Sequence, residues 1–164
     1  MSTDWIKRIA EDERKRDDVC LRGTEAAARK ADLVHVHGQR LLDELRLTVA
    51  RDIEQFRQEF PDDQIREIVF DPVQLGGGFA VHKPRYPTAS LSVAPNLDAA
   101  SVSCQYRFTP TNGLPPREDR LELMFTGDAG DTLQIKHHGT GQVFTNADDL
   151  SEYLLLPVFT GRPR

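Results

Sequence analysis

The chain has 164 residues, of which 38% are hydrophobic and 29% are charged, and its formal net charge is −5. This length fits one domain with its own hydrophobic core. Apolar runs such as Leu154 to Leu156 are far too short to cross a bilayer, and an acidic chain lacks the basic surface that phosphate backbones require. We therefore expect neither a membrane nor a nucleic acid among its partners.

The two cysteines, Cys20 and Cys104, fall in different predicted elements. A secreted chain of this size usually carries a denser disulfide framework, so we expect two free thiols in a reducing compartment. The N-terminus reaches acidic residues within a dozen positions and offers no apolar core of a signal peptide. These features favour a cytoplasmic protein.

The composition changes between residues 60 and 61. Residues 1–60 contain no proline and 25 charged residues, whereas residues 61–164 hold all ten prolines and nine of the eleven glycines. This contrast predicts a long helical segment over 1–60, followed by an antiparallel sheet and a C-terminal helix over 61–164. We expect one structural domain of the α+β class.

The helical pattern begins at Ser2 and Thr3, which are good N-cap residues, and it stops before Pro61. An unbroken helix of this length would span about 85 Å. Gly23 and Gly38 each cost a helix about 1 kcal/mol, so a break at either one would fold the segment into a hairpin. Neither glycine has turn residues around it, which favours one continuous helix.

Two apolar stripes run along this helix. The first steps by 4 and 3 in the spacing of a coiled coil, through Cys20, Thr24, Ala27, Ala31, Val34, Gly38, Leu41, Leu45 and Thr48. Its first six members are small, and we call them the predicted seam, a candidate interface. The second stripe, expected to lie on the sheet, is Leu42, Leu45, Val49, Ile53, Phe56 and Phe60.

Alternating apolar and polar residues predict about six strands after Pro61. They cover 65–70, 79–83, 89–93, 102–108, 121–125 and 133–137, and a short strand at 142–144 closes the series. Turn residues at 96–98 and 127–130 separate neighbours, so the strands should form an antiparallel meander with one buried face. A final helix starts at 145–148, presents Leu150, Tyr153, Leu154 and Leu156 to the core, and is disturbed at Pro157, after which Val158 and Phe159 return to the domain.

Familiar catalytic and metal-binding motifs are absent from the sequence. His35 and His37 are two apart on a helix and point to different sides, and His137 and His138 are neighbours in a strand, so neither pair can share one ion. The glycines at 76–78 lack the Lys-Ser/Thr of a phosphate loop and precede a strand instead of a helix. We expect no metal and no cofactor.

The outward face of the sheet is the other extended feature. It could be a flat docking platform or a solvated surface with weak cross-strand ion pairs, and we favour the solvated surface. Its residues are Ser90, Ser92, Ser101, Ser103, Gln105, Arg107, Arg120, Glu122, Gln134 and Lys136.

Two functions fit these patterns. The leading one is a non-enzymatic interaction or assembly module that forms a homodimer, or binds another protein, through the predicted seam, because the seam precedes the part of the helix that a sheet can cover. The alternative is a small-ligand-binding or catalytic domain with a pocket between the sheet and the helices. Its candidate residues are Cys104, Tyr106, His137 and Tyr153, polar or reactive groups on otherwise apolar faces.

Overall fold

The structure, a computed structural model, describes residues 3–74, 76–110, 112–127 and 132–164. The predicted turn at 127–130 falls mostly outside these residues. The elements in chain order are α1 (Asp4–Glu59), β1 (Val69–Asp71), β2 (Phe79–Lys83), β3 (Thr88–Asn96), β4 (Ser101–Thr109), β5 (Arg117–Gly127), β6 (Leu133–His137), β7 (Val143–Phe144) and α2 (Ala147–Thr160). The α+β class is confirmed.

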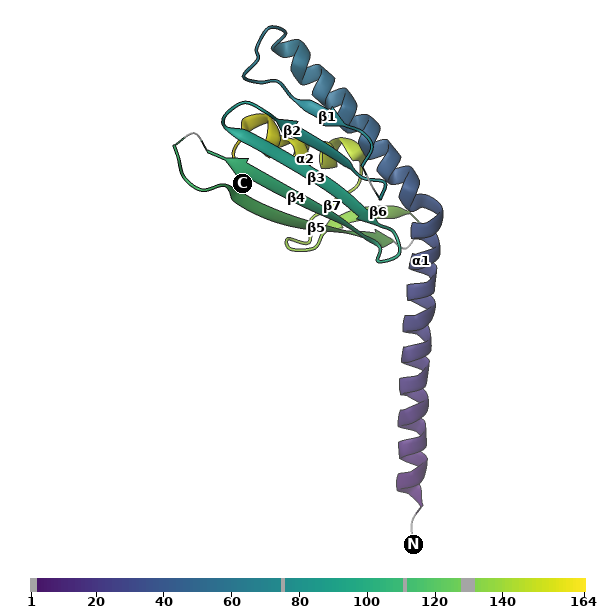
Figure 1. Cartoon of the computed structure of the whole chain (residues 1–164). Helices are drawn as coiled ribbons and strands as arrows, with labels where there is room; N and C mark the ends of the chain where they lie inside the picture. Colours follow the sequence, from purple (N-terminus) through teal and green to yellow (C-terminus); the bar gives the residue numbers. More distant parts are fainter. Residues whose placement is uncertain (1–2, 75, 111, 128–131) are drawn as a thin grey trace.

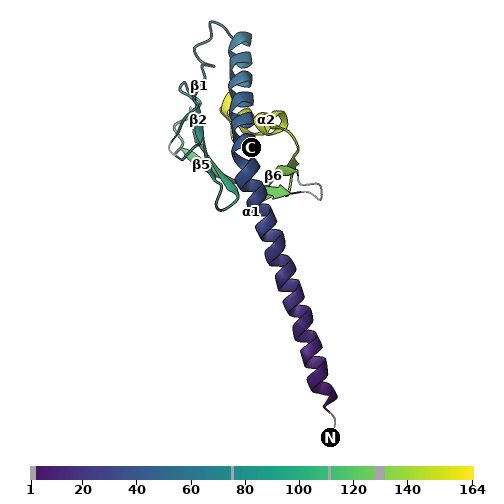
Figure 2. The same cartoon turned by 90° about the vertical axis from the view of Figure 1, so that its right-hand side faces the viewer.

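The seven described strands form one antiparallel sheet in the order β1 to β7, so each strand pairs with its neighbours in sequence. The predicted meander is confirmed, and the short closing strand brings the count to seven. The sheet curls around the helices, with β1 and β2 on one side of α1 and β6 on the other (Figure 2). α1 packs on β5 and β6, while α2 packs on β2, β3 and β7 and also against α1.

α1 is one unbroken helix of 56 residues, and both Gly23 and Gly38 lie inside it. The sheet and α2 sit beside its C-terminal half, and its N-terminal half extends beyond them (Figure 1). Its first fully buried residue is Val34. We call residues 4–32 the projecting segment; at 1.5 Å per residue it is about 43 Å long.

The core forms where the second predicted stripe meets the sheet and α2. Leu42, Leu45, Val49 and Ile53 are at most 2% exposed, which confirms the stripe over this part of α1. Their partners include Phe79, Leu91, Leu123, Phe125, Leu150, Leu154 and Val158. Near the end of α1 the stripe is only partly covered: Phe56 stacks on Phe159 at 4.2 Å between ring centroids, and Phe60 is 38% exposed.

Polar contacts tie α1 to α2 beside this core. Ser151, which is fully buried, donates its hydroxyl to Asp52 at 2.7 Å. Arg51 pairs with both Asp52 and Asp148, so it joins the two helices at the protein surface. These contacts fix the position of α2 along α1, and α2 in turn fills the concave face of the sheet.

The first strand is shorter than predicted. It begins at Val69, while the predicted start at Ile65 lies in a turn. The reason is local, because the Asp63 carboxylate accepts the backbone N–H of Ile65 at 2.9 Å and pairs with the Arg66 side chain. A short side chain that captures the backbone in this way competes with strand pairing.

The ends of the two helices also depart from expectation. Thr3 stands at the N-cap of α1, but its side chain makes no capping bond, and Ser2 lies outside the described residues. In α2, Asn146 is the N-cap, and its side chain accepts the N–H of Asp149 at 2.8 Å. Pro157 does not end the helix, which runs on to Thr160, and Leu156 is 52% exposed where the core was expected.

The continuation through Pro157 has a physical explanation. A proline has no N–H for the carbonyl four residues earlier, which here belongs to Tyr153. The Arg164 guanidinium donates to that Tyr153 carbonyl and also lies over the Tyr153 ring. The side chain of Arg164 therefore replaces the missing backbone donor. Gly161 then ends α2 in the left-handed conformation, at φ +66°.

Two leucines on α1 test how far this packing stabilises the fold. Leu45 is 1% exposed and Leu47 is 72% exposed. We expect Leu45→Ala to lower the free energy of unfolding by about 2–5 kcal/mol, because it leaves a cavity under the sheet. The matched control Leu47→Ala should change it by less than about 0.5 kcal/mol. Urea denaturation followed by circular dichroism measures both, and equal losses would contradict this packing.

Candidate functional site

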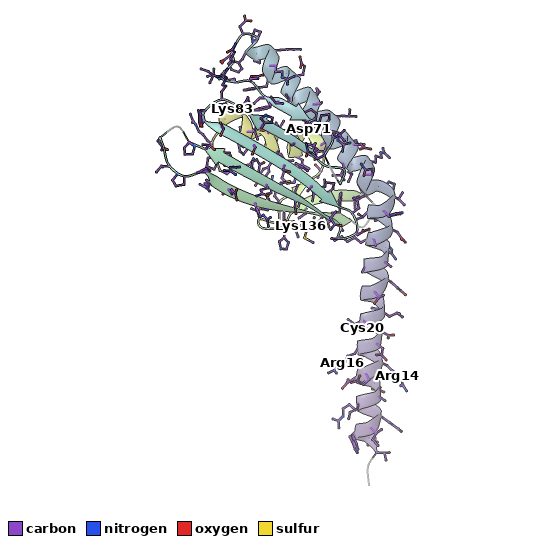
Figure 3. All side chains as sticks on the ribbon, viewed as in Figure 1. Arg14, Arg16, Cys20, Asp71, Lys83 and Lys136 are labelled. Carbon is purple, nitrogen blue, oxygen red and sulfur yellow. The ribbon has the colours of Figure 1, made fainter. Side chains whose placement is uncertain are left out.

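The projecting segment is an extended surface that the rest of the described chain leaves uncovered. Apart from Ala10 and Lys30, which are partly covered, its residues are exposed. In Figure 3, Arg14, Arg16 and Cys20 lie on this segment, well away from the sheet. Its side chains are therefore accessible along nearly its whole length.

Four members of the predicted seam lie on this segment and are exposed: Cys20, Thr24, Ala27 and Ala31. The prediction of an exposed interface does not hold for Val34 and Gly38. Val34 is fully buried, and a Cβ built on Gly38 would come within 2.9 Å of the Leu97 side chain. The β3–β4 turn that carries Leu97 reaches further along α1 than the spacing alone indicates, so the available surface ends near residue 32.

Three large apolar side chains near the N-terminus were not among the predicted site residues. Trp5, Ile6 and Ile9 are 55%, 50% and 51% exposed. Their helical spacing of three and four residues could have identified them, because it continues the apolar side of α1 towards its N-terminus. The projecting segment thus carries large apolar residues near its tip, and the seam residues nearer the domain are small.

The projecting segment has little to stabilise it within one chain. An isolated helix of this length is marginal in water, because most helical stability comes from packing an apolar face. Gly23 adds a cost of about 1 kcal/mol relative to alanine. The Thr24 hydroxyl donates to the Cys20 carbonyl at 2.9 Å, which adds no tertiary contact. Covering this helix would therefore be favourable.

The charges along the chain are divided unevenly. Residues 4–32 hold eight Lys or Arg and eight Asp or Glu, so the projecting segment has no net charge. The whole formal charge of −5 consequently belongs to the remainder of the chain. Two such helices can approach each other without net repulsion, whereas two globular parts repel.

A second feature is a pocket of about 300 Å³ between β4, β5 and α2. Tyr106 and Phe108 form its aromatic side, with ring centroids 5.8 Å apart and nearly parallel planes. Tyr153 and Arg164 line it from the C-terminal side, and residues 118–121 of β5 complete it. Apart from the two tyrosines, the sequence did not predict these residues. The packing of α2 against this corner of the sheet joins distant parts of the chain and leaves no local pattern in the sequence.

Two of the four residues predicted for the alternative pocket line this pocket, and the other two, Cys104 and His137, are not among its lining residues. Tyr106 and Tyr153 line the pocket, the His137 ring meets the Tyr153 ring edge-on at 5.9 Å between centroids, and Cys104 is buried on the same face of β4. Tyr106 donates its hydroxyl to the Leu154 carbonyl at 2.6 Å. Burial raises the pKa of Tyr106 above its ordinary value and that of Cys104 to about 12.

These surroundings do not favour catalysis. A nucleophilic cysteine needs a lowered pKa, whereas the thiol of Cys104 stays protonated at neutral pH. The hydroxyl of Tyr106 is already engaged in holding α2. Lys83, the buried cation of β2 labelled in Figure 3, is also engaged: its ammonium donates to the carbonyls of Arg85 and Pro87 at 2.9 and 3.0 Å.

The remaining candidate features have structural roles or face solvent. On the outer face of the sheet, Ser103 donates to Glu122 at 2.7 Å across neighbouring strands, as expected of a solvated face with cross-strand partners. The glycine loop at 76–78 connects β1 to β2, and the Gly77 carbonyl accepts a bond from Arg46 at 2.7 Å. Within the described residues no three His, Cys, Asp or Glu side chains gather as a metal site.

Comparisons with known proteins identify no family for this chain. No protein-family model matches the chain, and no curated protein or solved structure is significantly similar to it. In the part of the chain that the structure describes, neither helix is long and apolar enough to span a membrane. A proposal about function therefore has to rest on the geometry of the projecting segment and of the pocket.

His137 provides a test of the packing beside the pocket. Its partial burial, and secondly the charge of Arg164, lower its pKa below 6.5. Its Nδ1 also accepts the Thr140 N–H at 2.9 Å, a bond that protonation of Nδ1 would remove. Between the lowered pKa and 6.5 the unfolded chain binds more protons than the folded one, so stability falls as the pH drops through this window.

We expect the substitution His137→Gln to remove this part of the pH dependence. The free energy of unfolding, measured by urea titration at about pH 7.5 and about pH 5.5, should fall less for the variant than for the wild type. The absolute stability of the variant also changes, because the contact with Tyr153 is altered, so the comparison is between slopes. An unchanged slope would show that His137 is not held in its neutral form.

Proposed function

We propose that this protein is a non-enzymatic assembly module that self-associates through its projecting segment. One observation carries the proposal: α1 continues for about 43 Å beyond the domain while the rest of the described chain leaves it uncovered. A helix that pairs with a second helix buries its apolar side and gains the packing that an isolated helix lacks.

The chemistry of the surface supports a second helix as the partner. Cys20, Thr24, Ala27 and Ala31 are small and lie on one side of α1, which lets another helix approach closely. The segment has no net charge, so two copies meet no overall repulsion along it. The buried polar groups described above are engaged in holding the fold, which favours a binding role over a catalytic one.

Two glutamates placed on the seam test self-association. In the variant Cys20→Glu with Thr24→Glu, carboxylates would have to be buried between the helices, so we expect the dimer to become a monomer. The mass in solution, measured by light scattering on a sizing column, should fall by half. Because both positions are exposed, the urea unfolding of the globular part should change little.

The matched control places two glutamates on exposed positions of α1 away from the seam. Val36 and Leu47 are 66% and 72% exposed, and Val36→Glu with Leu47→Glu changes the charge by the same amount. This control should keep the wild-type mass. A wild type that is monomeric at every concentration, or a dimer that survives both pairs of substitutions, would contradict the proposal.

The pocket supports a second candidate, the binding of a small ligand. Its volume of about 300 Å³ is at the lower end of the range for ligand sites, and two of its aromatic walls were predicted. A thermal-shift screen with metals, nucleotides and common metabolites tests it. Stabilisation that disappears in Tyr153→Ala would favour this function, and the absence of any stabilising compound would count against it.

A further inference from the structure

Six residues of the projecting segment form a continuous heptad series. Ile6, Ile9, Glu13, Arg16, Cys20 and Gly23 follow one another at steps of 3, 4, 3, 4 and 3. This is the spacing of the two core positions of a coiled coil, so all six lie along one side of α1. Cys20 also belongs to the predicted seam. The series has large residues at one end, opposite charges in the middle and small residues at the other end.

We propose that two copies pair through this series as an antiparallel coiled coil, with a twofold axis between residues 14 and 15. This arrangement rests on the proposed self-association and specifies its geometry. Core positions of antiparallel helices meet in layers, and here the two residue numbers of each layer add up to 29. Ile6 faces Gly23 of the second copy, Ile9 faces Cys20, and Glu13 faces Arg16.

The charged layer favours this direction of pairing. In a parallel pair, Glu13 would meet Glu13 and Arg16 would meet Arg16, and such like-charge contacts are unfavourable. In the antiparallel pair each Glu13 meets an Arg16, and the twofold axis creates this contact twice. Within one chain the two side chains already form an exposed ion pair at 3.3 Å, so they lie at neighbouring positions on the helix surface.

The sizes of the apolar residues favour the same register. Ile6 and Ile9 are half-exposed in the single chain. In the proposed layers they meet Gly23 and Cys20, which are small, and a Cβ at Gly23 would have no neighbour within 4 Å in the single chain. Large side chains packed against small ones allow close contact of the helices along the pair.

The distribution of charge over the whole chain also favours the antiparallel direction. The globular part carries the entire net charge of −5. In a parallel dimer the two globular parts would lie side by side. In the antiparallel dimer they lie at opposite ends, with their first buried residues about 60 Å apart along the helices. This distance is several times the Debye length at physiological salt, so their repulsion is screened.

Disulfide crosslinking of the full chain tests the direction and register. In the proposed dimer the two native Cys20 residues are separated by about 16 Å along the helices, too far for a disulfide. The substitution Ile9→Cys places a thiol opposite Cys20 of the other copy. Under oxidised glutathione this variant should form a covalent dimer that joins position 9 of one copy to Cys20 of the other, and the wild type should not. Cys104 is buried and does not interfere.

The matched control is Glu11→Cys, which places a thiol two residues away on the opposite side of the helix. We expect at least a tenfold lower yield of covalent dimer from it. Mass spectrometry identifies the link, because trypsin releases residues 9–14 and 17–22 as separate peptides. Efficient crosslinking of wild-type Cys20 would indicate a parallel pair and overturn the inference.

The outcomes separate the inference from the proposed function. A dimer by light scattering without a link between position 9 and Cys20 overturns the antiparallel register but leaves self-association intact. A monomer at every concentration overturns both. Charge reversal gives an independent measurement: Glu13→Arg should raise the dimer dissociation constant at least tenfold, and the added substitution Arg16→Glu should restore it. Failure of this rescue in a protein that dimerises would overturn the proposed layer.

Discussion

Burial of one stripe of α1, from Val34 to Ile53, under the curled sheet and against α2 is the interaction on which the other features of this protein depend. It gives the meander the second layer that its apolar face requires, and it anchors α2 inside the curve. The sheet is shorter than α1, so the same helix must emerge from the domain. The side of α1 that is buried near Leu45 is therefore uncovered near Ala27.

Polar side chains of the domain also hold neighbouring elements in place. Tyr106 holds the Leu154 carbonyl, Ser151 holds Asp52, and Arg164 supplies the donor that Pro157 lacks. Two of these contacts satisfy hydroxyls that would otherwise be buried without a partner, those of Tyr106 and Ser151. The hydroxyls of Tyr106 and Ser151 and the guanidinium of Arg164 therefore hold the elements of the domain together.

Much of this arrangement could be predicted from local patterns. The period of two located the strands from Phe79 to His137, and Pro61 marked the end of α1. Features that depend on distant contacts could not be predicted. These are the packing of Leu97 on Gly38, the hydrogen bond from Arg164 that replaces the donor missing at Pro157, and the packing of α2 against β4 and β5 that forms the pocket. For the candidate site, the small residues of the seam were visible in the sequence, whereas its boundary near residue 32 required the fold.

The continuity of α1 across the domain boundary has a mechanical consequence. Because no loop separates the two halves, the projecting segment, once a partner helix stabilises it, acts as a lever fixed in the core at Val34. A tilt of about 5° at that point would move the tip by roughly 4 Å, which is less than one helical turn. The core therefore sets the direction in which the tip points, and anything attached to the tip inherits a defined orientation relative to the sheet.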